Sequence, residues 1–171
     1  MNQTIVKITS IVEFIQALWP IENQPMKRLI SFLILISPSL LFAQILDFNF
    51  FDSNGHSYQS KNFNVQIEKE YNSKYNLKMI LVETPDLKDS LFQKQFKFLN
   101  SMDAEELNLI YISACFNNED KDGYHTSINT AKTLMNSRPE FRIRILNNDG
   151  KVLKESRNIL PTDTIKKILL K

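Results

Sequence analysis

The sequence predicts an α/β domain of three layers, in which a central mixed sheet is flanked by helices on both faces. Two continuous apolar runs, at residues 77–82 and 106–116, have the composition of strands that are buried on both sides. Amphipathic segments with helical spacing follow them, and an alternating segment with a turn motif comes next. The predicted order from about Leu77 is β-α-β-α-β-β-α, which favours strands connected through helices.

The first strand and the first helix of this order form the clearest pair. The run LKMILV, at residues 77–82, ends at a turn that begins with Thr84, and apolar residues then recur at helical spacing through residues 87–102. Thr84, Asp86 and Asp89 carry side chains typical of a helix cap or a first helical turn, so we expect the helix to start near Asp86. The turn is therefore predicted to serve the fold and not catalysis.

A second strand and helix follow. ELNLIYISACF (106–116) is the second buried strand, NNEDKDG (117–123) is a polar loop, and INTAKTLMNS (128–137) is a short helix. That helix is expected to end at Arg138-Pro139, because the residue before a proline is disfavoured in helical conformation. The next strand should begin soon after this proline.

The C-terminal part predicts a hairpin and a closing helix. FRIRIL alternates as a strand does, KVLKES is the return strand, and the NNDG between them places Asp149 and Gly150 at a turn. The segment 163–171 carries one apolar stripe at helical spacing, and Thr162 is expected to cap it. Residues 77–171 are therefore predicted to form the main domain.

Residues 44–76 are expected to form an N-terminal extension with short strands. Alternation in LDFNF and FNVQI suggests strands around Asn54-Gly55, a pair that tolerates positive φ in a turn. Whether these strands join the main sheet is left open by the pattern.

Residues 26–43 have the layout of a secretory signal peptide. A basic pair opens the segment, an apolar run follows, and Ala43 comes directly before a polar change. A membrane-spanning helix is the alternative, but the run contains Pro38 and is shorter than the roughly 20 residues that a helix needs to cross a bilayer. We therefore predict an exported domain that begins at Gln44, resides in the periplasm or at the cell surface, and has no membrane contact after cleavage.

Residues 1–25 precede this segment and carry little charge, which is not how signal peptides begin. We hypothesise that Met26 is the true start, so that residues 1–25 are a spurious extension from an upstream start codon or a disordered one. A short amphipathic helix in TIVKITSIVEFIQALW is the alternative.

The predicted order of elements resembles the thioredoxin fold. Thioredoxin-like proteins place a proline, often cis, before the first strand of the hairpin, and Pro139 in RPEFRIRIL matches that position; a simple helix-ending proline is the alternative. NLKMILVETP, which ends at Pro85, and FRIRILNNDGKVLKES also resemble a peroxiredoxin-related, thioredoxin-like domain family of unknown function. That family occurs in bacterial exported proteins and in animal extracellular sushi-repeat and coiled-coil proteins. The resemblance covers about residues 71–171 and implies no established activity.

Thiol redox chemistry is the activity that this fold most often suggests, but the expected cysteines are missing. A thiolate at the N-terminus of the first helix gains from the helix dipole, and a CxxC pair would lie between Pro85 and Leu91, where the sequence has no cysteine. The peroxiredoxin pattern would also begin at Pro85, and Asp89 and Phe92 occupy the positions of its Thr or Ser and its Cys. Cys115 is the remaining candidate, although a lone cysteine in an apolar run is most often a small buried side chain.

No cofactor, metal ion or nucleic acid is indicated. His56 and His125 are far apart in the sequence, and neither is followed by a ligand at i+3 or i+4 on an evident helix. The acidic loop 117–123 lacks the distal glutamate of a calcium loop, and no strained elbow surrounds Ser90. The 21 basic residues nearly balance the 19 acidic ones, so nucleic acid is not an implied partner.

We therefore predict an exported, non-catalytic binding or interaction module whose partner is an unidentified protein or other component of the cell envelope. The alternative is a thiol redox or peroxiredoxin-like protein in which Cys115 acts with a partner thiol. Exposure of Cys115 and the pKa of its thiol distinguish the two hypotheses.

Overall fold

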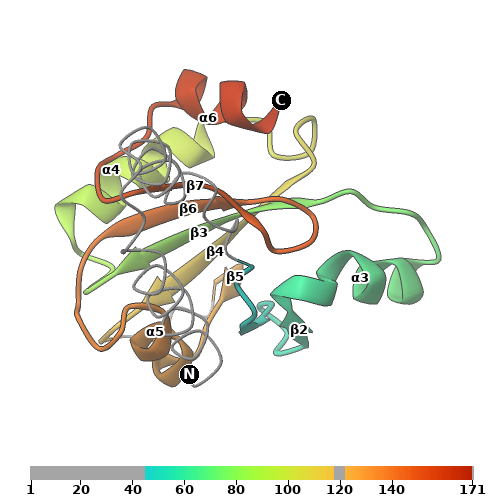
Figure 1. Cartoon of the computed structure of the whole chain (residues 1–171), viewed down its shortest axis with the longest axis horizontal. Coiled ribbons are helices and arrows are strands. Elements are labelled where there is room, and N and C mark those ends of the chain that lie inside the picture. Colours follow the sequence, from blue (N-terminus) through green and yellow to red (C-terminus); the bar gives the residue numbers. More distant parts are fainter. Residues whose placement is uncertain (1–44, 118–121, 171) are drawn as a thin grey trace, which may run out of the picture. The chain divides into compact units, whose positions relative to one another are not determined.

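The fold is a mixed sheet with helices packed on both faces (Figure 1). The computed structural model describes residues 45–117 and 122–170, all within one of the chain's two structural units, Ala43–Lys171. The strands in this part are β1 (Asn49–Phe51), β2 (Ser57–Gln59), β3 (Lys78–Thr84), β4 (Leu109–Cys115), β5 (Tyr124–His125), β6 (Arg142–Leu146) and β7 (Val152–Ser156). The helices are the short 3-10 helix η1 (Ser60–Asn62), α3 (Phe63–Tyr71), α4 (Ser90–Asn100), α5 (Ile128–Leu134) and α6 (Thr162–Leu169).

The strand β3 lies inside the sheet, between β4 and β6. In the described residues the seven strands are ordered β2-β1-β5-β4-β3-β6-β7. β4 runs parallel to β3 on one side, and β6 runs antiparallel to it on the other. The predicted order β-α-β-α-β-β-α from about Leu77 is therefore confirmed, with β5 as an additional short strand between β4 and α5.

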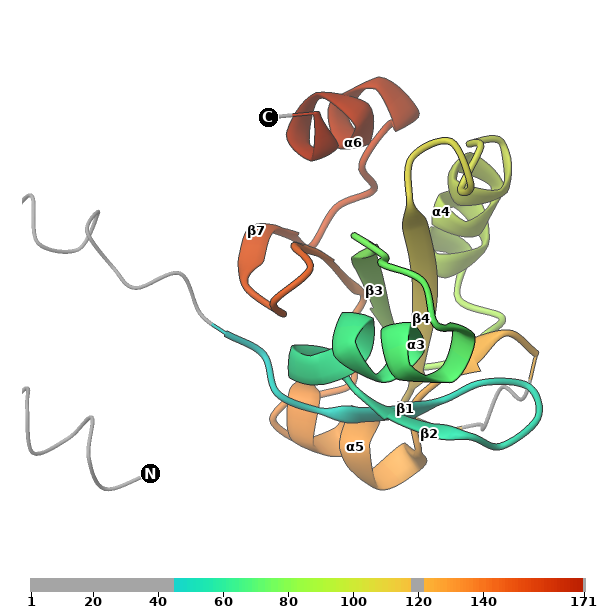
Figure 2. The same ribbon diagram turned by 90° about the vertical axis from the view of Figure 1, so that its right-hand side faces the viewer.

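Each face of the sheet has its own apolar core. Met79 and Leu81 of β3 pack in a cluster with residues of α3 and α5, whereas Ile80 and Val82 pack in a cluster with residues of α4 and α6. Figure 2 shows the same division, with α4 and α6 on one side and α3 and α5 on the other. Because successive side chains of a strand point to opposite faces, a strand covered on both sides must be apolar at nearly every position.

The segment before β3 belongs to the same sheet. β1 and β2 form an antiparallel hairpin, with Asn54-Gly55 between them, and β1 pairs with β5 through Phe51 and His125. The ring of Phe50 is fully buried, with its centroid 5.1 Å from that of Phe63. The N-terminal strands thus extend the sheet at one edge and share its core.

The prediction of a strand in FNVQI was wrong, because residues 63–67 form the first turns of α3. The alternation of apolar residues at 63, 65 and 67 suggested period two, but Val65 is 52% exposed and only Phe63 and Ile67 are buried. A spacing of four residues places two side chains on one face of a helix. The short apolar pattern fits both periods, and packing against Phe50 selects the helix.

One detail of the helix predictions also needs correction. Thr162 does not cap α6: it is the first residue of the helix, Pro161 occupies the N-cap position, and no side-chain hydrogen bond caps this end. The peptide bond before Pro139, whose isomer the sequence left open, is trans.

No helix in the described ranges is long and apolar enough to cross a membrane. The predicted signal peptide at 26–43 and the extension at 1–25 lie outside the described residues.

Gly150 is the glycine whose substitution should cost most. Its φ is +74°, and an added Cβ would lie 3.0 Å from the Leu46 carbonyl oxygen, whereas Gly55 has φ +84° and open space around it. We expect Gly55→Ala to lower the free energy of unfolding by about 1 kcal/mol through backbone strain alone. Gly150→Ala should lose about 2–3 kcal/mol, because the contact adds to the strain.

Urea unfolding followed by circular dichroism measures both losses. Gly55→Ala is the matched control, since it differs from Gly150→Ala only in what surrounds the new methyl group. Equal losses in the two variants would show that the contact between residue 150 and Leu46 relaxes without cost.

Candidate functional site

The carboxyl ends of β3 and β4 meet at one edge of the sheet, because the two strands are parallel and pair Thr84 with Cys115. The turn after β3 is closed by its own hydrogen bonds. The Thr84 hydroxyl donates to the Asp86 carbonyl oxygen at 2.6 Å, and the Asp86 side chain accepts from the Lys88 amide at 2.8 Å. These bonds hold the turn in place before the helix begins.

α4 starts at Ser90, four residues later than the expected start near Asp86. Asp89 is its N-cap: one carboxylate oxygen accepts from the amides of Leu91 at 2.9 Å and Phe92 at 3.0 Å. The amides that would stabilise a thiolate at this position are thus bonded to a carboxylate. The first turn of α4 therefore carries an N-cap aspartate, and no cysteine lies at residues 85–91.

Cys115 lies beside this turn but is buried. Its side chain is 3% exposed, and its Sγ is 4.0 Å from the carbonyl oxygen of Pro85. The tertiary structure therefore brings the single cysteine to the edge of the sheet where the turn lies, a proximity that the sequence did not reveal. A thiol with so little exposure is poorly accessible to a second thiol or to a peroxide.

The other residues singled out in the sequence lie at the two ends of the same sheet. Pro85 follows β3 and Pro139 precedes β6, and the antiparallel pairing of these strands puts both prolines at one end. Asp149 and Gly150 lie at the opposite end, in the turn between β6 and β7. There the Gly150 amide donates to the Asn147 carbonyl oxygen at 3.1 Å, and the Asp149 amide donates to the Asn147 side chain at 3.0 Å.

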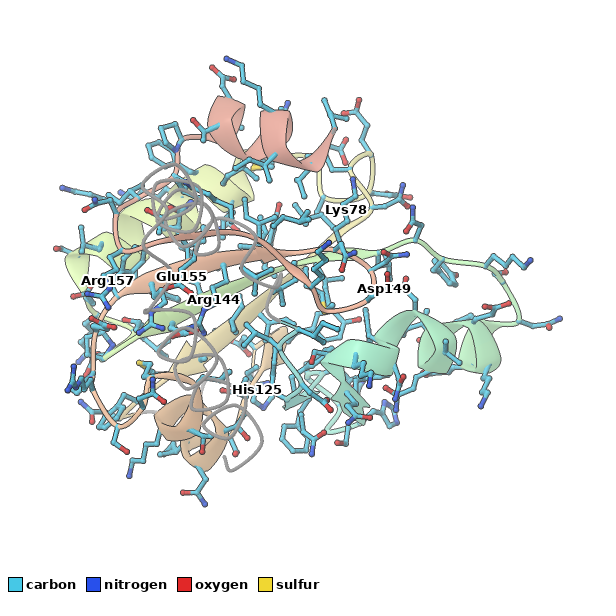
Figure 3. All side chains as sticks on the ribbon, in the orientation of Figure 1. Lys78, His125, Arg144, Asp149, Glu155 and Arg157 are labelled. Carbon is cyan, nitrogen blue, oxygen red and sulfur yellow. The ribbon has the colours of Figure 1, made fainter. Side chains whose placement is uncertain are left out.

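An ionic cluster with a buried centre at Glu83, Arg142 and Arg144 crosses β3, β6 and β7. Strand register pairs Glu83 with Arg142 and Arg144 with Glu155, and Figure 3 shows Arg144 beside Glu155. Arg144 donates to Glu83, and also to Glu155 at 2.8 Å. Arg142 lies 3.6 Å from the other Glu83 oxygen and bonds Glu140. We call these residues, namely Glu83, Glu140, Arg142, Arg144 and Glu155, the Glu83 cluster.

Burial controls the acidity of Glu83. The side chain is fully buried, and this loss of solvation raises the pKa of Glu83 to about 7, against the opposing effect of Arg144 and Arg142. One of its oxygens, Oε2, has no hydrogen-bond partner among the described residues. The cluster therefore contains a carboxyl group that titrates near neutral pH inside the sheet.

A pocket of about 630 Å³ lies between α4 and the strands β4 and β5. We call it the α4–β4 pocket. Its lining is mainly apolar and aromatic and includes Val82, Phe92, Phe96, Leu99, Tyr111 and Tyr124. The polar side chains in the lining are Gln93, Asn100, Ser113 and the acidic Asp122. Pockets that hold small ligands are commonly of this size and mainly apolar, with a few polar groups.

Ser113 is the unusual polar residue of this pocket. It pairs in register with Val82 on the central strand, and its hydroxyl oxygen is buried without a hydrogen-bond partner in the described part of the chain. The other hydroxyl of the lining strand is engaged, because Tyr111 donates to the Leu99 carbonyl oxygen at 3.1 Å. A buried hydroxyl without a partner is uncommon and calls for an explanation.

The histidines have separate roles. His56 Nδ1 lies 3.0 Å from an Asp52 carboxylate oxygen, and the His125 ring contacts Phe51. In residues 45–117 and 122–170, no group of three or more His, Cys, Asp or Glu side chains could hold a metal ion. The acidic loop considered for calcium falls largely at 118–121, outside the described residues.

Sequence reasoning missed both the pocket and the Glu83 cluster. Phe96 counted as part of the apolar stripe of the first helix, yet its side chain is 44% exposed and lines the pocket. The apolar residues of this helix form a stripe too wide to be buried completely against the sheet. The width of the stripe was the sequence signal that could have indicated a partly exposed position such as Phe96. FRIRIL was predicted only as an alternating strand with no role for its arginines, whereas Arg142 and Arg144 are 6% and 4% exposed and belong to the Glu83 cluster.

Comparison with solved structures identifies the fold. The thioredoxin domain of a thiol-disulfide oxidoreductase from Bacteroides vulgatus matches with a TM-score of 0.51 and 11% identity, covering 74% of this chain and 92% of that one. Arabidopsis thaliana ScoI with copper bound matches with a TM-score of 0.53 and 9% identity, covering 74% and 97%. At such identities the likeness concerns the fold alone. No family model matches the chain, and no curated protein does.

The protein thus has a thioredoxin-like α/β fold, as the order of elements predicted. Its cysteine is buried, and an aspartate caps the helix that follows the central strand.

The pKa of Glu83 predicts a specific dependence of stability on pH. Between about pH 4.5 and pH 7 the folded protein retains a proton on Glu83 that the unfolded chain has lost. Protonation of Glu83 therefore stabilises the folded protein at low pH, and this contribution to the free energy of unfolding disappears as the pH rises to about 7. The difference between wild type and Glu83→Gln should fall by a few kcal/mol over that range and stay flat above it.

Glu140→Gln is the matched control for this experiment. Its hydrogen bond from Arg142 lowers the pKa of Glu140, so its contribution is present above the ordinary glutamate pKa and disappears as the pH falls. Denaturant unfolding at a series of pH values should therefore give a Glu140→Gln difference that stays flat from pH 4.5 to 7 and shrinks only below about pH 4.5, whereas the Glu83→Gln difference falls between pH 4.5 and 7. A Glu83→Gln difference that is constant or increases from pH 4.5 to 7 would contradict the assignment.

Proposed function

We propose that this protein is an exported thioredoxin-like domain that acts as a non-catalytic binding or interaction module in the periplasm or at the cell surface. The observation that carries the proposal is the state of the first turn of α4: Asp89 occupies its amides, no cysteine lies at residues 85–91, and Cys115 is 3% exposed. A thioredoxin-like protein without an accessible thiol keeps a surface for binding but lacks the group that performs thiol exchange.

The export of the domain is the part of the proposal that rests on sequence. A basic pair, an apolar run and Ala43 give residues 26–43 the layout of a cleaved signal peptide. The proposed partner is a protein or another component of the cell envelope. Membership of the peroxiredoxin-related family of unknown function is part of the same proposal.

The mass of the protein recovered from the envelope fraction of its own cells tests the export. A mass equal to that of a chain beginning at Gln44 supports cleavage at the proposed position. Recovery of a chain that still contains Met26 would favour an anchored protein, and a peptide from Met1 to Lys7 would contradict the proposal that Met26 is the start.

A thiol redox protein that uses Cys115 with a partner thiol is the second candidate. One observation favours it: Cys115 Sγ lies 4.0 Å from the Pro85 carbonyl oxygen, so the thiol borders the turn between β3 and α4, and an opening of this turn would bring it closer to solvent. In that case Cys115 would react at the rate set by the opening of the turn.

The reactivity of Cys115 with 5,5′-dithiobis(2-nitrobenzoate) separates the two candidates. Burial predicts that the folded protein reacts at least about 100-fold more slowly than the protein in denaturant. The folded protein should also neither reduce insulin nor consume peroxide.

A double variant supplies the matched control. Ser90→Cys in a Cys115→Ser background places a thiol at an exposed position in the first turn of α4, and it should react without delay. Rapid reaction of wild-type Cys115 would support the redox candidate. Catalytic turnover that survives Cys115→Ser would contradict the non-catalytic proposal by another route, because it would require a different catalytic group.

A further inference from the structure

The α4–β4 pocket has a flat, aromatic wall. The rings of Phe92 and Phe96 are stacked, with centroids 5.9 Å apart and planes inclined by 14°. Phe92 is 6% exposed and Phe96 is 44% exposed, so the inner ring is fixed in the core and the outer one reaches solvent. Aromatic side chains of this kind favour flat, apolar ligands through stacking and edge contacts.

The charge of the pocket limits what it can hold. Among its lining residues in the described part of the chain there is no lysine, arginine or histidine. An anionic group would have to leave water without a positive partner, which is costly in a mainly apolar site. The lining therefore favours a neutral molecule over an anionic one of the same shape.

One polar group of the pocket is buried without a hydrogen-bond partner in the described residues. The Ser113 hydroxyl oxygen is buried and has no hydrogen-bond partner in the described residues, whereas the Tyr111 hydroxyl is bonded to Leu99. A ligand that entered between Phe96 and β4 could supply the missing hydrogen bond. Mainly apolar walls with a few hydrogen-bonding groups are typical of sites that orient small, largely apolar molecules.

We propose that the α4–β4 pocket binds a neutral, flat, largely apolar small molecule whose one hydrogen-bonding group pairs with the Ser113 hydroxyl. This inference rests on the proposed function as a binding module and names a ligand class for it. The volume of about 630 Å³ accommodates a molecule of two or three rings.

Fluorescence titration of the purified chain with N-phenyl-1-naphthylamine tests the proposal. This probe is neutral, has flat rings and carries one N–H group that can donate to the Ser113 oxygen. We expect one probe to bind per chain with micromolar affinity. 1-Anilinonaphthalene-8-sulfonate has the same ring system with an added negative charge, and it should bind at least about tenfold more weakly.

Three variants locate the binding site. Phe96→Ala should weaken binding about tenfold by removing the outer ring of the wall. Phe98→Ala is the matched control: Phe98 lies on the same helix and is 39% exposed but does not line the pocket, so its loss should leave the affinity unchanged. Ser113→Ala should weaken binding about fivefold without lowering stability, because the hydroxyl has no partner in the described residues of the free protein.

Several results would overturn the proposal. These are no saturable binding, equal affinity for the charged and neutral probes, or equal effects of Phe96→Ala and Phe98→Ala. Sedimentation of the wild type as a dimer that Phe96→Ala dissociates would assign the pocket to a second copy of the chain. Failure of probe binding leaves the non-catalytic proposal intact if Cys115 is unreactive, whereas insulin reduction or peroxide consumption would overturn that proposal whatever the probe does.

Discussion

The burial of β3 on both faces is the constraint on which the rest of the structure depends. All its residues from Met79 to Thr84 are buried, so both sides of the strand must be covered. One face is closed by α4 and α6 and the other by α3 and α5. The paired strands β4 and β6 satisfy its backbone hydrogen bonds on both edges, and an apolar strand at the centre of a sheet is stable only with such complete cover.

The same constraint accounts for the Glu83 cluster. Glu83 is the last residue but one of a fully buried strand, and a buried carboxyl group is tolerated when partners of opposite charge or hydrogen bonds are near. Arg142 and Arg144 stand on the neighbouring strand β6, with Glu155 on β7 beyond it. The hairpin that completes the sheet thus also supplies the charges that make the burial of Glu83 tolerable. The Glu83 cluster depends on the register of β6 against β3, since a shift of β6 by one residue would move both arginines to the opposite face of the sheet.

The two regions with functional interest lie on different parts of this frame. At the carboxyl end of β3, where thiol chemistry would be expected, the turn is closed by Thr84 and Asp86 and the helix by Asp89. The nearby Cys115 is packed beneath it. The α4–β4 pocket, by contrast, has a mainly apolar lining, and its Ser113 hydroxyl has no hydrogen-bond partner among the residues that the structure describes. The turn and the pocket are thus two separate features of one fold, and the fold by itself assigns an activity to neither.

The sequence by itself determined the order of elements from β3 to α6, because hydrophobic periodicity and turn residues are local properties of the chain. It also determined the absence of cysteine from residues 85–91. It did not determine that FNVQI is helical, since that short pattern fits two periods and packing against Phe50 selects one. Only the tertiary structure decided that Cys115 lies beside Pro85, that two arginines surround Glu83, and that Phe96 and Ser113 line one pocket. These relations depend on strand register and helix packing between residues distant in the chain, and a single sequence carries no direct record of either.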